Sequence, residues 1–179
     1  MIYFIRHGES EANLRNVFAG QKDDALLTDK GRDQAKTTGQ NIKNSGLKID
    51  KIIFSPLKRT TETAKIIADE LSFDVSKMTS DARIIEYDMG SLTGKTLEKI
   101  SSARLTAAEN AEDPQLFHDR ILSCLKELSS FSENILLVSS AGVGRMIEII
   151  RIHGDVKKFY DLPAHPNGSV TKLDWLENF

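Results

Sequence analysis

Three short runs of apolar residues constrain this chain more than any other feature, because each run ends abruptly in polar residues. The runs are Ile2-Tyr3-Phe4-Ile5, Ile52-Ile53-Phe54 and Ile135-Leu136-Leu137-Val138. Continuous apolar runs of this length are typical of strands that are buried on both faces, as central strands of an α/β sheet are. We therefore expect these three segments to form the centre of one sheet.

Segments with helical periodicity lie between and after the three runs. Capping residues and apolar spacing place the expected helices from Thr28 to Gly46, after Ser55-Pro56, after Asp113-Pro114 and from about Gly142. The stretch 169–176 alternates loosely, and we expect an edge or closing strand there. This order predicts a three-layer α/β/α sandwich with a mostly parallel central sheet. Residues 1–179 are expected to form a single domain, with a short insertion or cap around 87–112.

Composition excludes several classes of protein. The 24 basic and 26 acidic residues give a net charge of −2, which argues against nucleic acid as a partner. No apolar run approaches the roughly 20 residues that span a bilayer, so we expect no membrane association. Cys124 is the single cysteine, and no secretory signal is visible after Met1. The prediction is therefore a cytoplasmic protein, and the sequence leaves its oligomeric state open.

Chemically active residues follow the apolar runs directly. They are Arg6-His7-Gly8-Glu9-Ser10 after the first run, Ser55-Pro56-Leu57-Lys58-Arg59 after the second, and Ser139-Ser140-Ala141-Gly142 after the third. Open α/β sheets bind ligands beyond the carboxyl ends of their strands, so these groups are expected to share one cavity. Guanidinium groups and helix N-termini both bind anions. The pattern predicts an oxyanion pocket, with phosphate as the favoured occupant and sulfate as an equivalent anion.

The histidine within this set is expected to act on the bound anion. Cationic neighbours lower the pKa of a histidine, which favours the neutral imidazole at His7. A neutral imidazole held against a phosphate is a nucleophile. The position of His7, between Arg6 and Gly8 and directly after a first strand, favours this role over that of a buried structural histidine.

The chain resembles the histidine phosphatase superfamily, also called phosphoglycerate-mutase-like, over nearly its whole length. The resemblance rests on five blocks in order: Ile5-Arg6-His7-Gly8-Glu9-Ser10-Glu11-Ala12-Asn13, Phe18-Ala19-Gly20, Leu27-Thr28-Asp29-Lys30-Gly31, Ser55-Pro56-Leu57-Lys58-Arg59-Thr60-Thr61-Glu62-Thr63-Ala64, and Glu86-Tyr87-Asp88-Met89-Gly90. It implies a phosphomonoesterase that forms a phosphohistidine and hydrolyses a small phosphorylated metabolite. The chain is short between the acid and the position of the second histidine, which favours a phosphatase over a mutase.

The resemblance also implies roles for individual residues. His7 becomes phosphorylated, and Glu86 protonates the leaving oxygen and later activates water. The phosphate and the rest of the substrate are held by Arg6, Asn13, Gly20, Gln21, Arg59, Ser140 and Ala141. No metal or cofactor is implied, because the chain has neither metal-ligand spacing of Cys and His nor a phosphate-binding G-x-x-x-x-G-K-[ST] loop.

Ser140 departs from the family pattern. The second histidine of the family normally follows the late apolar strand, and a serine stands in that slot here. Serine keeps one O–H donor but lacks the charge and reach of an imidazole. Ser140 is open to three interpretations: an engineered substitution, a natural change in a slowed enzyme, or the mark of a non-catalytic relative. His165 is a conceivable substitute, although its spacing does not favour it.

Two alternatives from other functional classes stay open. Ser140 could be the nucleophile of an esterase triad that continues through Asp155 or Asp161 to His165. Against this, Val138 replaces the first glycine of the G-x-S-x-G pattern. A non-catalytic protein that binds phosphorylated ligands is the second alternative, and phosphoglycerate-mutase-type phosphoryl transfer is the alternative within the family.

Overall fold

The computed structural model describes residues 1–97 and 100–178. A five-stranded sheet in the order β3-β2-β4-β1-β5 forms its middle layer. The strands are β1 (Ile2–Arg6), β2 (Lys51–Phe54), β3 (Met78–Ser80), β4 (Ile135–Ser139) and β5 (Val170–Lys172). β5 runs antiparallel to β1, and the other pairings are parallel. The three apolar runs therefore form the three central strands, as the sequence predicts.

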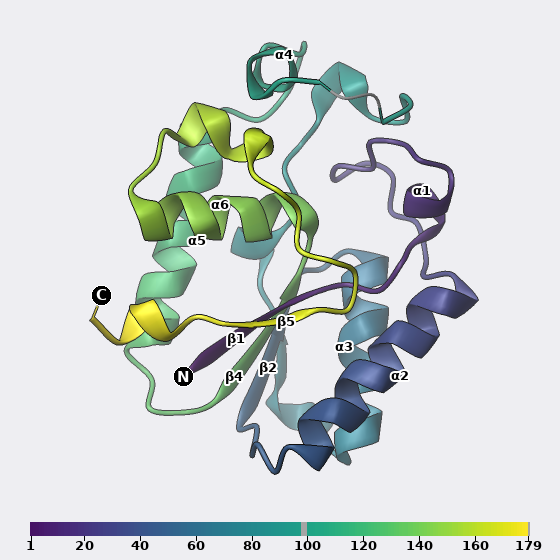
Figure 1. The fold of residues 1–179 in the computed structure, drawn as a ribbon, viewed down its shortest axis with the longest axis vertical. Coiled ribbons are helices and arrows are strands. Elements are labelled where there is room, and N and C mark those ends of the chain that lie inside the picture. The colour runs from purple at the N-terminus through teal and green to yellow at the C-terminus, as the bar shows by residue number, and fades with distance from the viewer. Residues whose placement is uncertain (98–99, 179) are drawn as a thin grey trace.

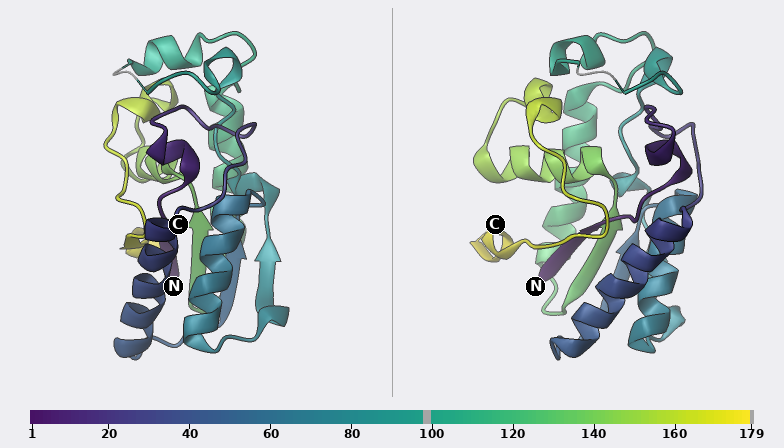
Figure 2. Two further views of the ribbon diagram at one scale, coloured as in Figure 1. Left: turned by 90° about the vertical axis from the view of Figure 1, so that its right-hand side faces the viewer. Right: turned by 45° about the vertical axis from the view of Figure 1, so that its right-hand side comes forward.

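Helices cover both faces of this sheet. α2 (Asp29–Asn44) and α3 (Lys58–Leu71) lie on one face, and α5 (Pro114–Ser129) and α6 (Ala141–Ile152) lie on the other (Figures 1 and 2). Short helices complete the chain: α1 (Glu11–Leu14), α4 (Ser102–Thr106) and the 3₁₀ turns Val75–Lys77, Ala82–Ile84, Gly90–Leu92, Val156–Asp161 and Asp174–Asn178. The arrangement is the predicted three-layer α/β/α sandwich.

Two apolar cores hold the layers together. Ile5, Ile52 and Leu136 pack with α2 and α3, whereas Phe4 and Leu137 pack with α5 and α6. Successive residues of a strand point to opposite faces, so a run that is apolar throughout supplies both cores. This explains why the apolar run within each central strand is uninterrupted.

The helix starts follow the predicted capping residues with one shift. Thr28 accepts a hydrogen bond from the N–H of Gly31, and Asp113 accepts from Gln115 at the start of α5. α3 begins at Lys58, two residues later than the Ser-Pro pair suggested, and Leu57 at its N-cap makes no side-chain hydrogen bond.

The structure contains one strand that the sequence did not indicate, and another strand is shorter than expected. β3 has the sequence Met-Thr-Ser, and two of its three residues are exposed at the sheet edge, so it carries no apolar signal. Within the stretch expected to close the sheet, only Val170–Lys172 forms a strand. The segment 87–112, apart from residues 98 and 99, which lie outside the described part of the chain, runs above the carboxyl ends of the strands (Figure 1).

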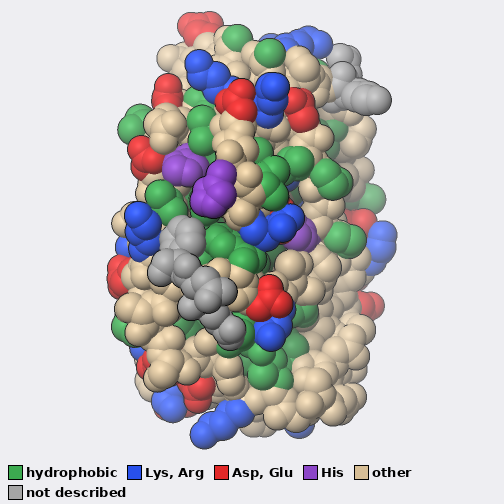
Figure 3. Space-filling view, turned by 60° about the vertical axis from the view of Figure 1, so that its left-hand side comes forward, with side chains coloured by type: hydrophobic (Ala, Val, Ile, Leu, Met, Phe, Trp, Pro, Cys, Tyr) green, Lys and Arg blue, Asp and Glu red, His purple; other side chains and the backbone are tan. Residues whose placement is uncertain are grey.

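Surface charge is mixed. Basic and acidic side chains are interspersed over the face drawn in Figure 3. Among the described residues, no helix is both long and apolar enough to cross a membrane.

Candidate active site

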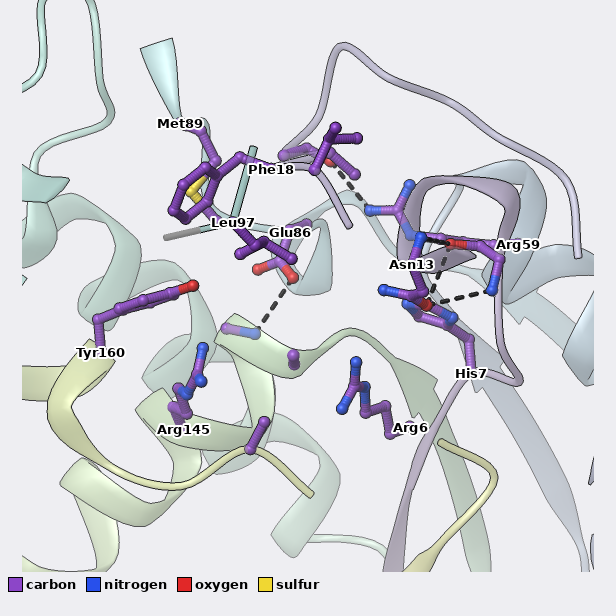
Figure 4. A pocket seen from close by; sticks show the side chains of 17 residues that line it. Arg6, His7, Asn13, Phe18, Arg59, Glu86, Met89, Leu97, Arg145 and Tyr160 are labelled. Carbon is purple, nitrogen blue, oxygen red and sulfur yellow. Dashed lines mark hydrogen bonds between the residues drawn. The ribbon is translucent and has the colours of Figure 1, made fainter. Parts of the chain in front are cut away.

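The central strands end level with one another and surround a single pocket. Arg6 at the end of β1 lies opposite Ser139 of β4, and Phe54 at the end of β2 lies opposite Val138. The residues beyond these ends enclose a cavity of about 140 Å³. Seven of the nine site residues expected from the sequence line it: Arg6, His7, Asn13, Gly20, Arg59, Glu86 and Ala141 (Figure 4).

His7 is held as a neutral imidazole, and one of its ring nitrogens has no partner among the described residues. Its side chain is buried, and Nδ1 lies 2.6 Å from the carbonyl oxygen of Gly8. A carbonyl oxygen only accepts, so Nδ1 carries the proton and Nε2 keeps its lone pair. Burial lowers the pKa of His7 well below its usual value, and the positive charges of Arg59 and Arg6 lower it further. The ring is thus prepared to act as a nucleophile through Nε2.

The backbone around His7 depends on two glycines that touch each other. A Cβ atom on Gly8 would lie 2.2 Å from the carbonyl oxygen of Gly31, and a Cβ on Gly31 would lie 2.0 Å from that of Glu9. Both distances are far shorter than any real contact, so neither position accepts a side chain. Two sequence motifs that lie more than twenty residues apart therefore form one tight contact that fixes the loop after β1.

Arg6 and Arg59 supply two guanidinium groups beside the imidazole. Arg59 is buried, and its two terminal nitrogens donate to the carbonyl oxygens of Asp23 and Gly20 at 3.1 and 2.9 Å. Arg6 donates to the carbonyl oxygen of His165 at 2.6 Å, and its buried Nε has no partner among the described residues. Burial lowers the pKa of both groups, but arginine stays charged in proteins. The pair forms a rigid cationic wall for an anion.

Asn13 presents its amide nitrogen to the same pocket. Its Oδ1 accepts from the backbone N–H of Ser10 at 3.1 Å and from Nδ2 of Asn167 at 3.3 Å. Since the oxygen is engaged, the NH₂ group is the donor that remains, and it has no partner in the described part of the chain. An amide donor beside two guanidinium groups and a neutral imidazole makes a site for a tetrahedral oxyanion.

Glu86 faces this anion site from the other side of the cavity. Its Oε1 accepts from the N–H of Tyr87 at 2.8 Å, and its Oε2 accepts from the N–H of Gly142 at 3.1 Å (Figure 4). The side chain is 6% exposed. The carboxyl group therefore lies at the N-terminus of α6, where it can reach an oxygen of a bound ester.

A partly buried arginine fixes the backbone that carries Glu86. Arg120 of α5 donates to the carbonyl oxygens of Arg83, Ile85 and Glu86 at 2.6, 2.7 and 3.1 Å. It also forms an ion pair with Glu112 at 2.7 Å. Four carbonyl and carboxylate partners leave this arginine no freedom, so it positions the segment without lining the pocket.

Two expected binding residues lie outside the lining. Nε2 of Gln21 donates to the carbonyl oxygen of Glu86 at 2.9 Å, which makes it a support of the acid segment. Ser140 is fully buried at the N-cap of α6, caps no backbone N–H and has a hydroxyl without a partner among the described residues. The position that is a histidine in the family pattern therefore contributes no side-chain contact to this pocket.

His165 does not replace the missing imidazole. Its Nδ1 lies 3.1 Å from the hydroxyl of Thr171, and its ring packs on Phe4 with 5.3 Å between centroids. The ring is not part of the pocket lining. Because Ser140 has no hydrogen bond to His165, the structure also contradicts the esterase triad that the sequence left open.

The sequence analysis missed several lining residues. They are Val17, Phe18, Ala19, Met89, Leu97, Arg145, Tyr160 and Ala164, whereas Ser10 and Gly142 of the lining belong to segments that were expected at the cavity. One of them, Arg145, follows Ala141 by four positions on α6, so helical spacing puts both on one face and could have indicated it. The described residues contain no cluster of three or more His, Cys, Asp and Glu side chains that could hold a metal ion.

Comparison with known proteins identifies the family. The profile of the histidine phosphatase superfamily (branch 1) matches residues 2–178. The chain belongs to this superfamily. It is similar to the 2,3-bisphosphoglycerate-dependent phosphoglycerate mutase of Bartonella bacilliformis, with 39% identity over 93 residues, or 52% of this chain and 45% of that protein. The 2,3-bisphosphoglycerate-dependent phosphoglycerate mutase of Brucella anthropi is 40% identical over 93 residues, which again are 52% of this chain and 45% of that protein. The matched part of the chain thus spans about half the length of these curated relatives.

Solved structures share the fold of this chain. Bacillus stearothermophilus YhfR has a TM-score of 0.81 at 23% identity, covering 95% of this chain and 88% of that one. The mycobacterial glucosyl-3-phosphoglycerate phosphatase Rv2419c in complex with VO3 has a TM-score of 0.78 at 22% identity, covering 95% and 90%. The superfamily supports phosphoryl-transfer chemistry on a small phosphorylated ligand.

Proposed function

We propose that this histidine phosphatase is a phosphomonoesterase that hydrolyses a small phosphorylated metabolite through a phosphohistidine on His7. The observation that carries the proposal is the hydrogen bond from Nδ1 of His7 to the carbonyl oxygen of Gly8, which leaves Nε2 unprotonated inside a cationic pocket. The substrate phosphate takes the place between Arg6, Arg59 and the amide of Asn13.

The reaction proceeds in two transfers. Nε2 of His7 forms a bond to phosphorus while the ester P–O bond breaks, and the carboxylic acid of Glu86 gives its proton to the departing oxygen. Water then attacks the phosphohistidine while the carboxylate of Glu86 takes a proton from it, the P–N bond breaks, and inorganic phosphate leaves. His7 and Glu86 return to their starting states, so atoms and protons balance.

Ser140 sets the rate of this enzyme rather than its chemistry. The family histidine would place a donor on an equatorial phosphoryl oxygen, and the buried hydroxyl of Ser140 supplies none. Loss of one preorganised donor costs roughly 10²–10³ in rate. The proposal is therefore a slow phosphatase, with both arginines still able to bind phosphate.

The proposal extends to organisation and location. We place the activity in one domain of 179 residues in the cytoplasm, with 87–112 acting as a cap, since Met89 and Leu97 of that segment line the pocket. The single cysteine, Cys124, is free and buried, which suits a reducing compartment.

Trapping the covalent intermediate tests the proposal. Incubation with ³²P-labelled phenyl phosphate and rapid quenching at alkaline pH should give a labelled protein whose label is lost in acid, as expected of a phosphohistidine. His7→Ala should remove both label and phosphate release, whereas His118→Gln, a change on the outer helix α5, should keep both. Hydrolysis without a His7-dependent label would refute the mechanism. Transfer of the label to added phosphoglycerate faster than to water would favour the mutase alternative, which the curated relatives support.

Binding without turnover is the remaining alternative. A protein that binds phosphate but releases none from any phosphomonoester, even after Ser140→His, would be a binding module built on the phosphatase fold.

A further inference from the structure

A third guanidinium group lies in the pocket, and the phosphate site does not use it. Arg145 of α6 and Tyr160 lie on the side of Glu86 that faces away from His7, with Arg6 between the two ends (Figure 4). The pocket therefore has a phosphate end around His7, Arg59 and Asn13, and a second end around Arg145.

The position of Arg145 is fixed, but its charge is not neutralised. Its Nε donates to the carbonyl oxygen of Leu162 at 2.8 Å, and its guanidinium carbon lies 4.1 Å from the ring centroid of Tyr160. No carboxylate in the described part of the chain forms an ion pair with it. Its charge lies close to the phosphate end, because it adds to the effect of burial in lowering the pKa of Arg6.

In-line transfer directs the rest of the substrate toward this second end. In phosphoryl transfer the attacking and leaving atoms lie on opposite sides of phosphorus. With Nε2 of His7 as the attacking atom, the leaving oxygen faces Glu86 and the group attached to it extends beyond Glu86. That direction leads to Arg145 and Tyr160.

The charges of the lining leave room for one more negative charge. Among the described lining residues, the guanidinium groups of Arg6, Arg59 and Arg145 face the single carboxyl group of Glu86. A phosphomonoester dianion neutralises two of these positive charges, and Glu86 is uncharged when it acts as the acid. One cation then remains without a counter-charge in a mostly buried site, which favours a substrate with a further anionic group.

The opposite wall of the second end is apolar. Phe18, Met89 and Leu97 line it across from Arg145 and Tyr160 (Figure 4). A leaving group there contacts apolar side chains on one side and a cation stacked on an aromatic ring on the other. Its body is therefore apolar, and its anionic group points to Arg145.

We propose that Arg145, held against Tyr160, is a specificity-determining residue that selects phosphomonoesters whose leaving group joins an apolar body to an anionic group such as a carboxylate. The inference rests on the proposed function of the same pocket, since it takes the phosphate end as the reaction centre. One charge-assisted hydrogen bond in such a site is worth roughly 10- to 100-fold in affinity.

Binding of matched phosphonates tests this without turnover, because a C–P bond does not transfer to histidine. Isothermal titration of the unaltered protein compares phenylphosphonate with 3- and 4-carboxyphenylphosphonate. Of the two carboxylated ligands, the one that binds more tightly should have an affinity at least roughly 10-fold higher than that of phenylphosphonate. Arg145→Met should abolish this preference while still binding phenylphosphonate, and Arg145→Lys should keep part of it. Arg151→Met is the matched control, because Arg151 lies on the outside of the same helix in an ion pair with Glu148.

Each outcome decides the inference. Three results would overturn the role of Arg145. They are equal affinity of the unaltered protein for all three phosphonates, a preference for a carboxylated phosphonate that is kept by Arg145→Met, and binding of none of the three by the unaltered protein. Hydrolysis of the corresponding phosphate esters is measured separately with Ser140→His. A phosphonate preference that depends on Arg145 without hydrolysis of any ester would refute the proposed function and leave the role of Arg145 standing.

Discussion

The carboxylate of Glu86 and the backbone N–H of Gly142 are joined by a hydrogen bond of 3.1 Å. This bond ties the segment that carries the acid to the N-terminus of α6, two residues after Ser140. It also leaves no space for a side chain, because a Cβ on Gly142 would lie 2.1 Å from Oε1 of Glu86. The acid and the start of α6 therefore act as one unit.

Substitution of Gly142 should displace the acid without touching the nucleophile. Gly142→Ala is expected to lower kcat/KM for an alkyl phosphate by roughly 10²-fold, the lower range of general acid catalysis. The effect on p-nitrophenyl phosphate should be smaller, because its leaving group needs little protonation. Gly154→Ala is the control, since its Cβ would meet only flexible isoleucine side chains. Unchanged kinetics of Gly142→Ala on both substrates would separate Glu86 from the reaction.

Removing the proton of Glu86 should produce the same leaving-group dependence. Glu86→Gln keeps the shape of the side chain but cannot donate an acidic proton. The substitution should therefore slow the departure of poor leaving groups more than it slows the departure of p-nitrophenolate. Steady-state kinetics over a series of phenyl and alkyl phosphates give the slope against leaving-group pKa. Glu109→Gln, at an exposed position, should keep the original slope. An equal decrease for all substrates would contradict the role of Glu86 as general acid.

Two substitutions at position 140 should have different effects on turnover. Ser140→His is expected to raise turnover roughly 10²-fold, because an imidazole reaches a phosphoryl oxygen that the serine does not contact. Ser140→Ala should leave turnover unchanged and thermal stability equal or slightly higher, because the buried hydroxyl it removes has no partner. Phosphate affinity, measured by titration, should change far less than turnover. A large loss of activity in Ser140→Ala would show that the hydroxyl takes part in catalysis.

The stability of the protein should depend on pH through His7. The pKa of His7 is held well below 6.5 in the folded chain, chiefly by burial, and returns to about that value on unfolding. Below pH 6.5 the unfolded chain therefore binds a proton that the folded chain does not, so stability falls as pH falls. The loss attributable to this group approaches about 1.4 kcal/mol per pH unit.

Urea unfolding at pH 7.5 and 5.5 checks this effect. His7→Gln lacks the titrating group, so its stability should decrease less over this interval than that of the unaltered protein. Parallel decreases in the two proteins would mean that His7 takes up a proton in the folded state as readily as in the unfolded one.

Local sequence determined the framework of this protein. The runs around Phe4, Ile53 and Leu137 are apolar without interruption, and short runs of this kind are typical of strands covered on both faces, so they predicted the central sheet. Caps such as Thr28 and Asp113 fixed helix starts because they act on backbone groups two or three residues away. The presence of Arg6, His7 and Arg59 in the pocket, where we propose a nucleophile and two phosphate-binding groups, was predicted from their place just after strand ends.

Tertiary structure decided which side chains from outside the sequence motifs also line the pocket. Arg145 and Tyr160 come from the helix after β4 and the 3₁₀ turn that follows it, and Leu97 comes from the segment after Gly90–Leu92, with no common pattern along the chain. The family resemblance implied that Gln21 binds substrate, yet its amide donates to the backbone carbonyl of Glu86. Ser140 was visible as a departure, but its lack of any partner was not. Sequence determines contacts that arise within a few residues of a strand end or a helix start. Contacts between distant segments depend on how the layers pack, and only the folded chain fixes those distances.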